Sequence, residues 1–304
     1  MRWRLGTRGS RLALAQADQV AAALRAVGVE IEIVSIRTSG DRLAQVALAE
    51  FGGKALFVKE IEDGLLDKRI DLAVHSLKDM PAVLPAGLVL GAFPAREDPR
   101  DTLITRGAGG LDGLAAGSVV ATSSLRRRAL LLGRRPDLVV APIRGNVDTR
   151  LAKLDAGQMD AIHLALAGLK RLGLQERATQ VLDPKTWLPS LGQGVIGIEI
   201  RETDTRAREL TGLLNHQPTE FALTCERAFQ AALDGSCRTP IAGLATIEGH
   251  TLSFHGEVLA PDGSDHAESR FTLDLGHDPR RTAQNGGARA GEALKPRVAK
   301  WLAL

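Results

Sequence analysis

Residues 194–200 read GVIGIEI, a strand pattern that has no obvious strand partner nearby in the sequence. Earlier in the chain, short β-branched runs alternate with helical patterns twice, over residues 2–93 and again over residues 118–166, which is typical of parallel βαβ units. The charged linker AREDPRD, residues 95–101, separates the two series. We therefore expect residues 194–200 to return to the first sheet, so that the chain crosses twice between two α/β domains and forms a hinged cleft.

The whole pattern predicts an α/β chain of three domains. Domain 1 comprises residues 1–95 and 194–213, and domain 2 comprises residues 100–189. Residues 217–304 contain a helix, three short strands and a terminal helix, which predicts a smaller α+β domain 3. A chain of 304 residues with 44% apolar residues is long enough to give each domain its own core.

Composition excludes several classes of function. The net charge of +3 is a mild excess, and the scarcity of aromatic residues, 3% with no tyrosine, argues against an RNA-binding protein. No apolar run approaches the roughly 18 residues of a membrane span. The apolar segment between Arg11 and Gln16 is too short for an export signal, so we expect a cytoplasmic protein. Cys225 and Cys237 lack a CxxC spacing, which argues against a metal site.

Basic side chains follow several predicted strands. In open α/β sheets, ligands bind beyond the carboxyl ends of the strands, where arginine forks can hold carboxylate or phosphate. No GxxxxGK[ST] sequence is present, so carboxylate is the favoured ligand group. We therefore predict a cleft for a molecule with several carboxylates. The cations at these positions are Arg8, Lys54, Arg126, Arg127, Arg144, Arg150 and Arg171.

An acidic residue accompanies these cations. Asp79 lies in VHSLKDMP, just after a buried-looking strand, and Pro81 favours an extended turn there rather than a continuing helix. Ionised Asp79 would stabilise a developing positive charge. A pairing with Lys78 or a loop cap explains the same residue equally well. His75, within the apolar strand, fits a histidine at the edge of the core better than a base.

The loop LDGSCRTPIAG, residues 233–243, places the Cys237 thiol among turn-forming residues. Taken alone, this thiol is either a small residue without a special role or a reactive group. A lone cysteine is only a candidate until its partners are found.

The ordered set of motifs resembles the porphobilinogen deaminases, also called hydroxymethylbilane synthases. The resemblance spans the whole chain, and the ordered combination of motifs is far more specific than any single motif. The motifs are LGTRGSRLALAQ, TSGD, GGKALFVKEIE, DLAVHSLKDMP, TSSLRRR, IRGNVDTRL, AGLKRLGL, LGQGVIGIE, CERAF and GSCRTPIAG.

This resemblance implies a monomeric three-domain enzyme whose first two domains are built like a type-2 periplasmic binding protein. It implies one dipyrromethane cofactor per chain, joined by a thioether to Cys237. The enzyme would add porphobilinogen to this primer until four substrate rings are joined, and would release ammonia and the linear tetrapyrrole hydroxymethylbilane. The alternative is a non-catalytic two-domain binder of anionic solutes, because a fold does not settle a function.

The resemblance also assigns roles to residues. It places the catalytic aspartate at Asp79. Cofactor binding falls on Cys237, Ser76, Lys78, Ser124, Arg126, Arg127, Arg144 and Arg150. Substrate binding falls on Arg8, Ser10, Lys54, Arg144, Arg171 and Gln193. The chain departs from the family pattern at Glu50, where some relatives have lysine, and at Ala55 and Ser236, where glycine is expected.

Overall fold

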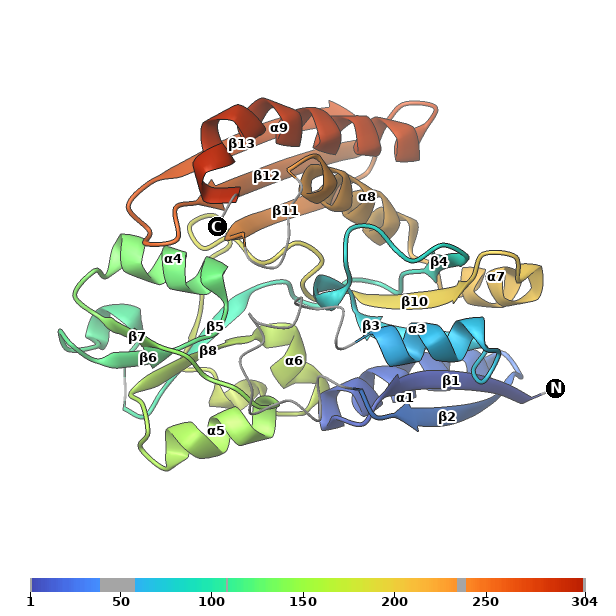
Figure 1. The fold of residues 1–304 in the computed structure, drawn as a ribbon, viewed down its shortest axis with the longest axis horizontal. Helices are drawn as coiled ribbons and strands as arrows, with labels where there is room; N and C mark the ends of the chain where they lie inside the picture. The colour runs from blue at the N-terminus through green and yellow to red at the C-terminus, as the bar shows by residue number, and fades with distance from the viewer. Residues whose placement is uncertain (1, 39–57, 108, 234–238, 303–304) are drawn as a thin grey trace. The chain divides into compact units, whose positions relative to one another are not determined.

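A computed structural model describes residues 2–38, 58–107, 109–233 and 239–302 of the chain (Figure 1). These residues divide into two compact units. The first unit comprises Met1–Glu97 and Gly194–Glu220, and the second comprises Asp98–Gln193 and Phe221–Leu304.

The first unit is built on a five-stranded sheet of order β2-β1-β3-β10-β4. Its strands are β1 (Arg2–Arg8), β2 (Glu30–Ile36), β3 (Leu72–Ser76), β4 (Leu88–Ala92) and β10 (Ile196–Arg201). β1 runs parallel to both β2 and β3, whereas β10 runs antiparallel to β3 and β4. The expectation that residues 194–200 return to the first sheet is confirmed by these pairings.

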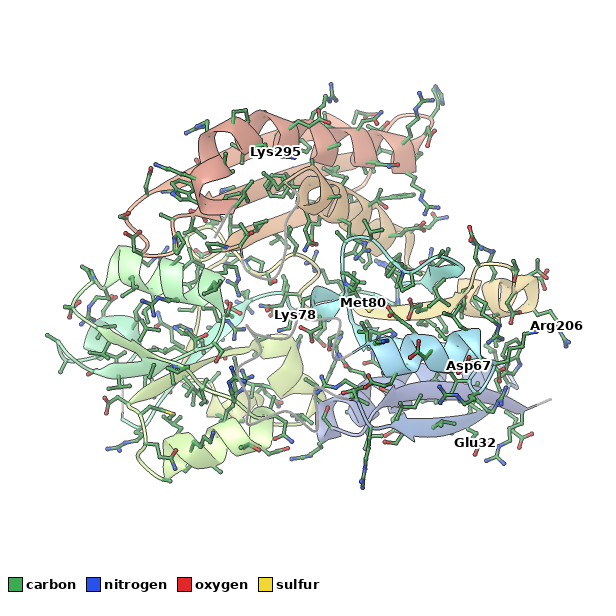
Figure 2. The ribbon with its side chains drawn as sticks, viewed as in Figure 1. Glu32, Asp67, Lys78, Met80, Arg206 and Lys295 are labelled. Carbon is green, nitrogen blue, oxygen red and sulfur yellow. The ribbon has the colours of Figure 1, made fainter. Side chains whose placement is uncertain are left out.

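The two faces of this sheet are covered by different helices. Helices α1 (Arg11–Ala26), α3 (Lys59–Leu66) and α7 (Thr205–Gly212) belong to this unit. Leu72 and Val74 of β3 pack in one cluster with α1, while Ala73 packs in another cluster with α3. Alternate residues of β3 therefore face opposite layers, as the period of a strand requires. A short 3₁₀ turn, Leu77–Asp79, follows β3, and Figure 2 labels Lys78 in it and Met80 directly after it.

The second unit contains a five-stranded sheet of order β7-β6-β8-β5-β9. Its strands are β5 (Asp101–Thr105), β6 (Val119–Ala121), β7 (Val139–Ala141), β8 (Ala161–Ala165) and β9 (Gln180–Val181), and its helices are α4 (Leu125–Arg134), α5 (Val147–Asp155) and α6 (Leu166–Arg171). β6 is parallel to β7 and β8, and β5 is antiparallel to β8 and β9. β5 is the first strand after the chain enters the second unit, and β10 is the first strand after it returns to the first unit. Each is the fourth strand in its sheet, so the two sheets share one topology.

A third sheet, antiparallel and three-stranded, also belongs to the second unit. It consists of β11 (Ile241–Glu248), β12 (Thr251–Leu259) and β13 (His266–Asp274), joined in sequence order. Helices α8 (Gln217–Ala232) and α9 (Pro279–Leu302) cover one of its faces (Figure 1). These elements confirm the predicted α/β class with an additional small α+β part.

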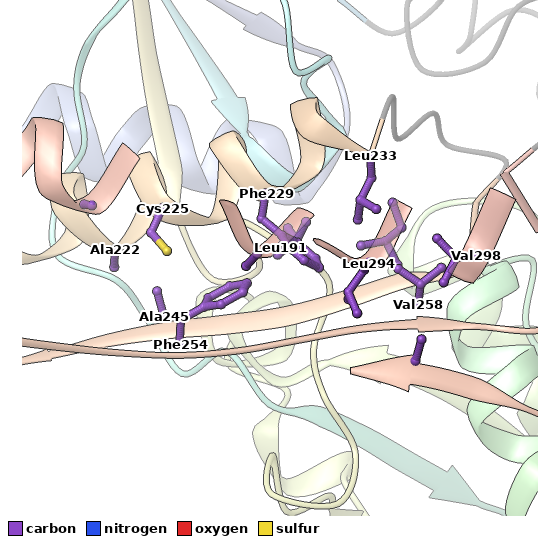
Figure 3. Packing of buried hydrophobic residues seen from close by; sticks show 14 of the residues in the cluster. Leu191, Ala222, Cys225, Phe229, Leu233, Ala245, Phe254, Val258, Leu294 and Val298 are labelled. Carbon is purple, nitrogen blue, oxygen red and sulfur yellow. The ribbon is translucent and has the colours of Figure 1, made fainter. Parts of the chain in front are cut away.

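The core under α8 and α9 is closely packed. Cys225 and Phe229 of α8 lie against Phe254 of β12 in one hydrophobic cluster (Figure 3). Gly287 of α9 lies against the carbonyl group of Cys225, and a side chain at this position would overlap that carbonyl. The close approach of the two helices therefore depends on glycine at position 287.

Candidate active site

In the first unit, predicted site residues follow two neighbouring strands. β1 and β3 are paired in parallel, with Leu5 opposite Leu72, so their carboxyl ends lie at the same edge of the sheet. Arg8 ends β1, and Ser10 caps the helix that follows it. Ser76 ends β3 and is followed by Lys78 and Asp79 in the 3₁₀ turn. Five predicted residues are thus gathered at one sheet edge.

The turn that carries Asp79 has the geometry that Pro81 favours. Met80, the residue before the proline, is extended, with φ −80° and ψ 143°, and is buried. The amide of Leu77 donates to the carbonyl of Val195 at 3.0 Å, and the amide of Met80 donates to Leu77 at 3.0 Å. Lys78 and Asp79 are half-buried. The predicted presentation of these residues at the strand end is confirmed, in a single 3₁₀ turn.

Two serines of this edge have defined hydrogen-bond partners. Ser10 is the N-cap of α1, and its side chain accepts from the amide of Ala13 at 3.3 Å. Ser76 Oγ accepts from Gln16 Nε2 at 2.9 Å and donates to Gln16 Oε1 at 3.0 Å. Gln16 is buried in α1. The hydroxyl at the end of β3 is therefore held by the helix that follows β1.

In the second unit, the carboxyl ends of three parallel strands carry predicted residues. Ser124 follows β6 and caps α4, accepting from the amide of Arg127 at 3.4 Å. Arg144 follows β7, and Arg171 ends the helix after β8. Because β7, β6 and β8 are neighbours, these three residues follow strands that end at one edge of the second sheet.

Arg150 is placed by the turn between β7 and α5. Its Nε donates to the carbonyl oxygen of Gly145 at 2.8 Å, within the same segment. Gly145 has φ +108°, a conformation that other residues rarely adopt. The glycine in the IRGN segment is thus needed to position the start of α5 and, with it, Arg150.

Arg126, Arg127 and Gln193 are brought together around a buried carboxylate, Asp101. Asp101 accepts from Arg126 at 2.7 Å and from Arg127 at 2.7 Å. It also accepts from Trp187 Nε1 at 3.0 Å and from Gln193 Nε2 at 2.8 Å. We call these five residues the Asp101 cluster.

The charges of the Asp101 cluster do not cancel. Burial alone would raise the pKa of Asp101, but the charges of Arg126 and Arg127 and their hydrogen bonds hold it well below its usual range. Two buried guanidinium groups thus face one buried carboxylate. The Nε groups of Arg126 and Arg127 are buried and have no hydrogen-bond partner among the described residues. The cluster therefore carries one positive charge in excess of its carboxylate.

The neighbouring histidine adds no charge to the cluster. His163 in β8 is buried, stacks on Trp187 with ring centroids 4.9 Å apart, and accepts from Arg127 through its backbone carbonyl at 3.0 Å. Burial and the charge of Arg127 lower the pKa of His163 to about 3. The imidazole is neutral at physiological pH.

Sequence reasoning missed Asp101 and Gln16. Asp101 was placed in the charged linker, although an acid at the start of the otherwise apolar strand DTLIT was an available signal. Gln16 sits on the apolar face of a helix, where a buried amide could also have been noticed. Predicted residues Lys54 and Cys237 lie outside the described residues, as do Glu50, Ala55 and Ser236.

The other cysteine is unsuited to covalent chemistry. Cys225 is completely buried in the hydrophobic cluster under α8 and α9. Burial raises the pKa of its thiol, which disfavours the reactive thiolate.

Two features are absent from the described residues. None of the helices they form has the length and apolar character needed to cross a membrane. Over the same residues, histidine, cysteine and acidic side chains form no group of three suited to a metal ion.

The fold is similar to solved structures of binding proteins. The methionine binding protein MetQ is 16% identical, with a TM-score of 0.45 over 72% of this chain and 90% of that chain. A periplasmic substrate-binding protein of an ABC transporter from Coxiella burnetii is 17% identical, with a TM-score of 0.43 over 70% of this chain and 91% of that chain. Likeness at this level is too remote to bear on function.

Sequence comparison identifies the family. Residues 3–209 match the family model of the porphobilinogen deaminase dipyromethane cofactor binding domain, and residues 221–295 match that of the porphobilinogen deaminase C-terminal domain. A porphobilinogen deaminase from Syntrophobacter fumaroxidans is 50% identical over 86% of this chain and 85% of its own length. Another porphobilinogen deaminase, from Sorangium cellulosum, is 47% identical over 96% of this chain and 97% of its own length. The chain belongs to the porphobilinogen deaminase family.

Proposed function

We propose that this chain is a hydroxymethylbilane synthase, a transferase that deaminates porphobilinogen and joins it head to tail on a covalent dipyrromethane primer. The observation that carries this proposal is the match of two family models, in order, over most of the chain. Ammonia is released at each addition, and water then hydrolyses the bond between the primer and the four added rings, which releases the linear tetrapyrrole hydroxymethylbilane and leaves the primer on the chain. A non-catalytic binder of anionic solutes has no comparable support.

The residues of the second unit fit a primer that carries several carboxylates. The dipyrromethane would supply the free pyrrole end to which the first substrate ring is joined, and each later ring would be joined to the ring added before it. Arg126 and Arg127 would attract one of its carboxylates, since the Asp101 cluster has one positive charge in excess. Further carboxylates would be bound by Ser124, Arg144 and Arg150 of the second unit and by Ser76 and Lys78 of the first.

Substrate carboxylates would be bound by another set of polar residues. These are Arg8, Ser10, Lys54, Arg144, Arg171 and Gln193. Arg8 and Ser10 share the sheet edge of Asp79 in the first unit. Their shared edge supports the proposal that these residues bind substrate next to the catalytic acid.

Asp79 would act on the charge that forms when ammonia leaves porphobilinogen. Its ionised carboxylate accepts a hydrogen bond from the pyrrole N–H and stabilises the methylene-pyrrolenine cation of the substrate. It also helps to move the proton that is released when the new carbon–carbon bond has formed. Such a charge-matched contact lowers the barrier by about 3 kcal/mol in a closed site.

Cys237 would be the tether of the primer through a thioether. The buried position of Cys225 supports this assignment, because that thiol has no room for an adduct. In the sequence, the small residues Gly235 and Ser236 directly precede Cys237, as a site for a bulky adduct would require.

We further propose that the protein is a cytoplasmic monomer that binds no nucleic acid. Its three domains would be residues 1–95 with 194–213, residues 100–189 and residues 217–304.

The role of Asp79 can be tested with Asp79→Asn, which keeps the size of the side chain and removes its charge. Single-turnover ammonia release should fall by about a hundredfold or more, while the covalent cofactor, measured by intact mass, is retained. Ammonia release at the wild-type rate by loaded Asp79→Asn would remove Asp79 from the chemistry.

A further inference from the structure

Three ionisable side chains are buried together in the first unit. Glu62 comes from α3, His75 from β3 and Glu199 from β10, and their exposures are 6%, 5% and 0%. His75 Nε2 and Glu199 Oε2 lie 3.0 Å apart. Ionisable groups are rarely buried without a specific role or a close partner.

Burial of Glu62, His75 and Glu199 together favours a fixed hydrogen bond between His75 of β3 and Glu199 of β10. Burial and the charge of Glu199 raise the pKa of Glu62 to about 7, against a smaller opposing effect of His75, while Asp63 on the same helix raises it slightly. Glu62 Oε1 and Glu199 Oε1 are buried without a hydrogen-bond partner among the described residues. Glu199 is therefore shielded from solvent, and the hydrogen bond described for its side chain is the one with His75.

This contact lies directly behind the turn that carries Lys78 and Asp79. In the β3–β10 ladder, Gly197 is opposite His75 and Ile196 is opposite Ser76. The next hydrogen bond along the two segments runs from the amide of Leu77 to the carbonyl of Val195. A fixed β3–β10 register thus fixes the first residue of the 3₁₀ turn.

The opposite face of β3 carries a second polar contact at the next residue. Ser76 exchanges two hydrogen bonds with the buried Gln16 of α1. Side chains of consecutive strand residues point to opposite faces, and β3 follows this rule, with α1 on one side and α3 on the other. Consecutive residues are therefore held from both faces, immediately before the turn.

We propose that Glu199 and Gln16 are positioning residues that hold His75 and Ser76 from opposite faces of the sheet and thereby fix the turn bearing Lys78 and Asp79. Neither residue contacts substrate in this account. The inference rests on the proposed role of Asp79, because a fixed turn matters for turnover only if Asp79 acts there.

The test uses amide hydrogen exchange and steady-state kinetics on the cofactor-loaded enzyme. Glu199→Met and Gln16→Met keep the approximate size of each side chain and remove its hydrogen bonds. In each variant the Leu77 amide should exchange about tenfold faster or more, because local opening becomes easier. The value of kcat should fall by about tenfold.

Two further variants separate positioning from a general loss of stability. Glu199→Gln keeps an acceptor for His75 Nε2 and should stay within about threefold of wild type in both measurements. Asp71→Asn weakens the pairing of Asp71 with Arg4 at the other end of β3, and should leave the Leu77 amide protected.

The inference would be overturned if the Leu77 amide exchanged at the wild-type rate in both methionine variants. It would also be overturned if Asp71→Asn accelerated this exchange as much as the methionine variants do. If Glu199→Met does not fold, Gln16→Met decides the question from the other face. Amide exchange is measured without substrate, so it does not depend on the proposed chemistry. An error in the proposed chemistry would instead appear as full activity of Asp79→Asn.

Discussion

The side-chain amide of Gln193 donates a hydrogen bond of 2.8 Å to the carboxylate of Asp101, across 92 residues of sequence. Gln193 is the last residue of the second unit before the chain returns to the first, and Asp101 lies just after the chain enters at Asp98. Gln193 Nε2 also donates to the carbonyl of Pro99 at 2.7 Å. The incoming and outgoing segments are therefore joined at a carboxylate that two arginines already hold.

Neutralising Asp101 should strongly destabilise the protein. Asp101→Asn leaves Arg126 and Arg127 buried without a compensating charge, and the free energy of unfolding should fall by about 3–5 kcal/mol. Urea unfolding at pH 7 provides the measurement. The matched control is Asp155→Asn, because the Asp155 pair with Arg177 is exposed and should contribute little. A loss no larger than that of the control would contradict the account.

The neutral state of His163 predicts an acid-dependent loss of stability. Its pKa is about 3 in the folded protein, below the ordinary value of 6.5, so between these pH values the unfolded chain binds a proton that the folded chain does not. Stability is therefore lost as pH falls below 6.5, by up to about 1.4 kcal/mol per pH unit from this group.

His163→Phe should remove this contribution and keep the stacking on Trp187. Unfolding free energies measured from pH 7 to pH 4 should then diverge, with the variant losing less than wild type. His266→Gln, at an exposed position, should follow the wild-type curve. Parallel curves for wild type and His163→Phe would show that His163 is not held neutral.

The contact of α9 with α8 should be sensitive to a single methyl group. Gly287→Ala would place Cβ against the backbone carbonyl of Cys225, which cannot move without shifting α8. Unfolding free energy should fall by about 1–3 kcal/mol, the usual cost of overpacking.

Gly212→Ala is the control for this helix substitution. No described atom lies within 4 Å of a Cβ at Gly212, near the end of α7. Stability should be unchanged or higher by about 0.5 kcal/mol, because alanine favours the helix. Equal effects of the two substitutions would mean that the α8–α9 contact is looser than described.

The main architecture could be predicted from sequence because each element carries its own periodic pattern. The GVIGIEI segment lacked a local partner and does pair with β3 and β4. Ser10, Ser124 and Asn146 also cap their helices through short-range hydrogen bonds that depend on residues three positions away.

The polar contacts inside the units could not be predicted in the same way. Arg126 looked like a ligand-binding cation at a strand end, yet its guanidinium donates to Asp101 and to the carbonyl of Leu188 at 2.7 Å. Asp101 and Gln193 are distant in sequence, and no local pattern links them. Such contacts depend on how elements meet in three dimensions, whereas periodicity reports only which face of an element is buried.

The central claim is that Cys237 carries a covalent dipyrromethane, and the intact mass of the purified chain tests it most directly. Wild type and Cys225→Ser should both show an excess equal to two linked pyrrole rings, which maps in wild type to the peptide containing Cys237. Cys237→Ser should show the unmodified mass and no turnover. An unmodified mass from active wild-type protein, or an adduct that survives Cys237→Ser, would contradict the account.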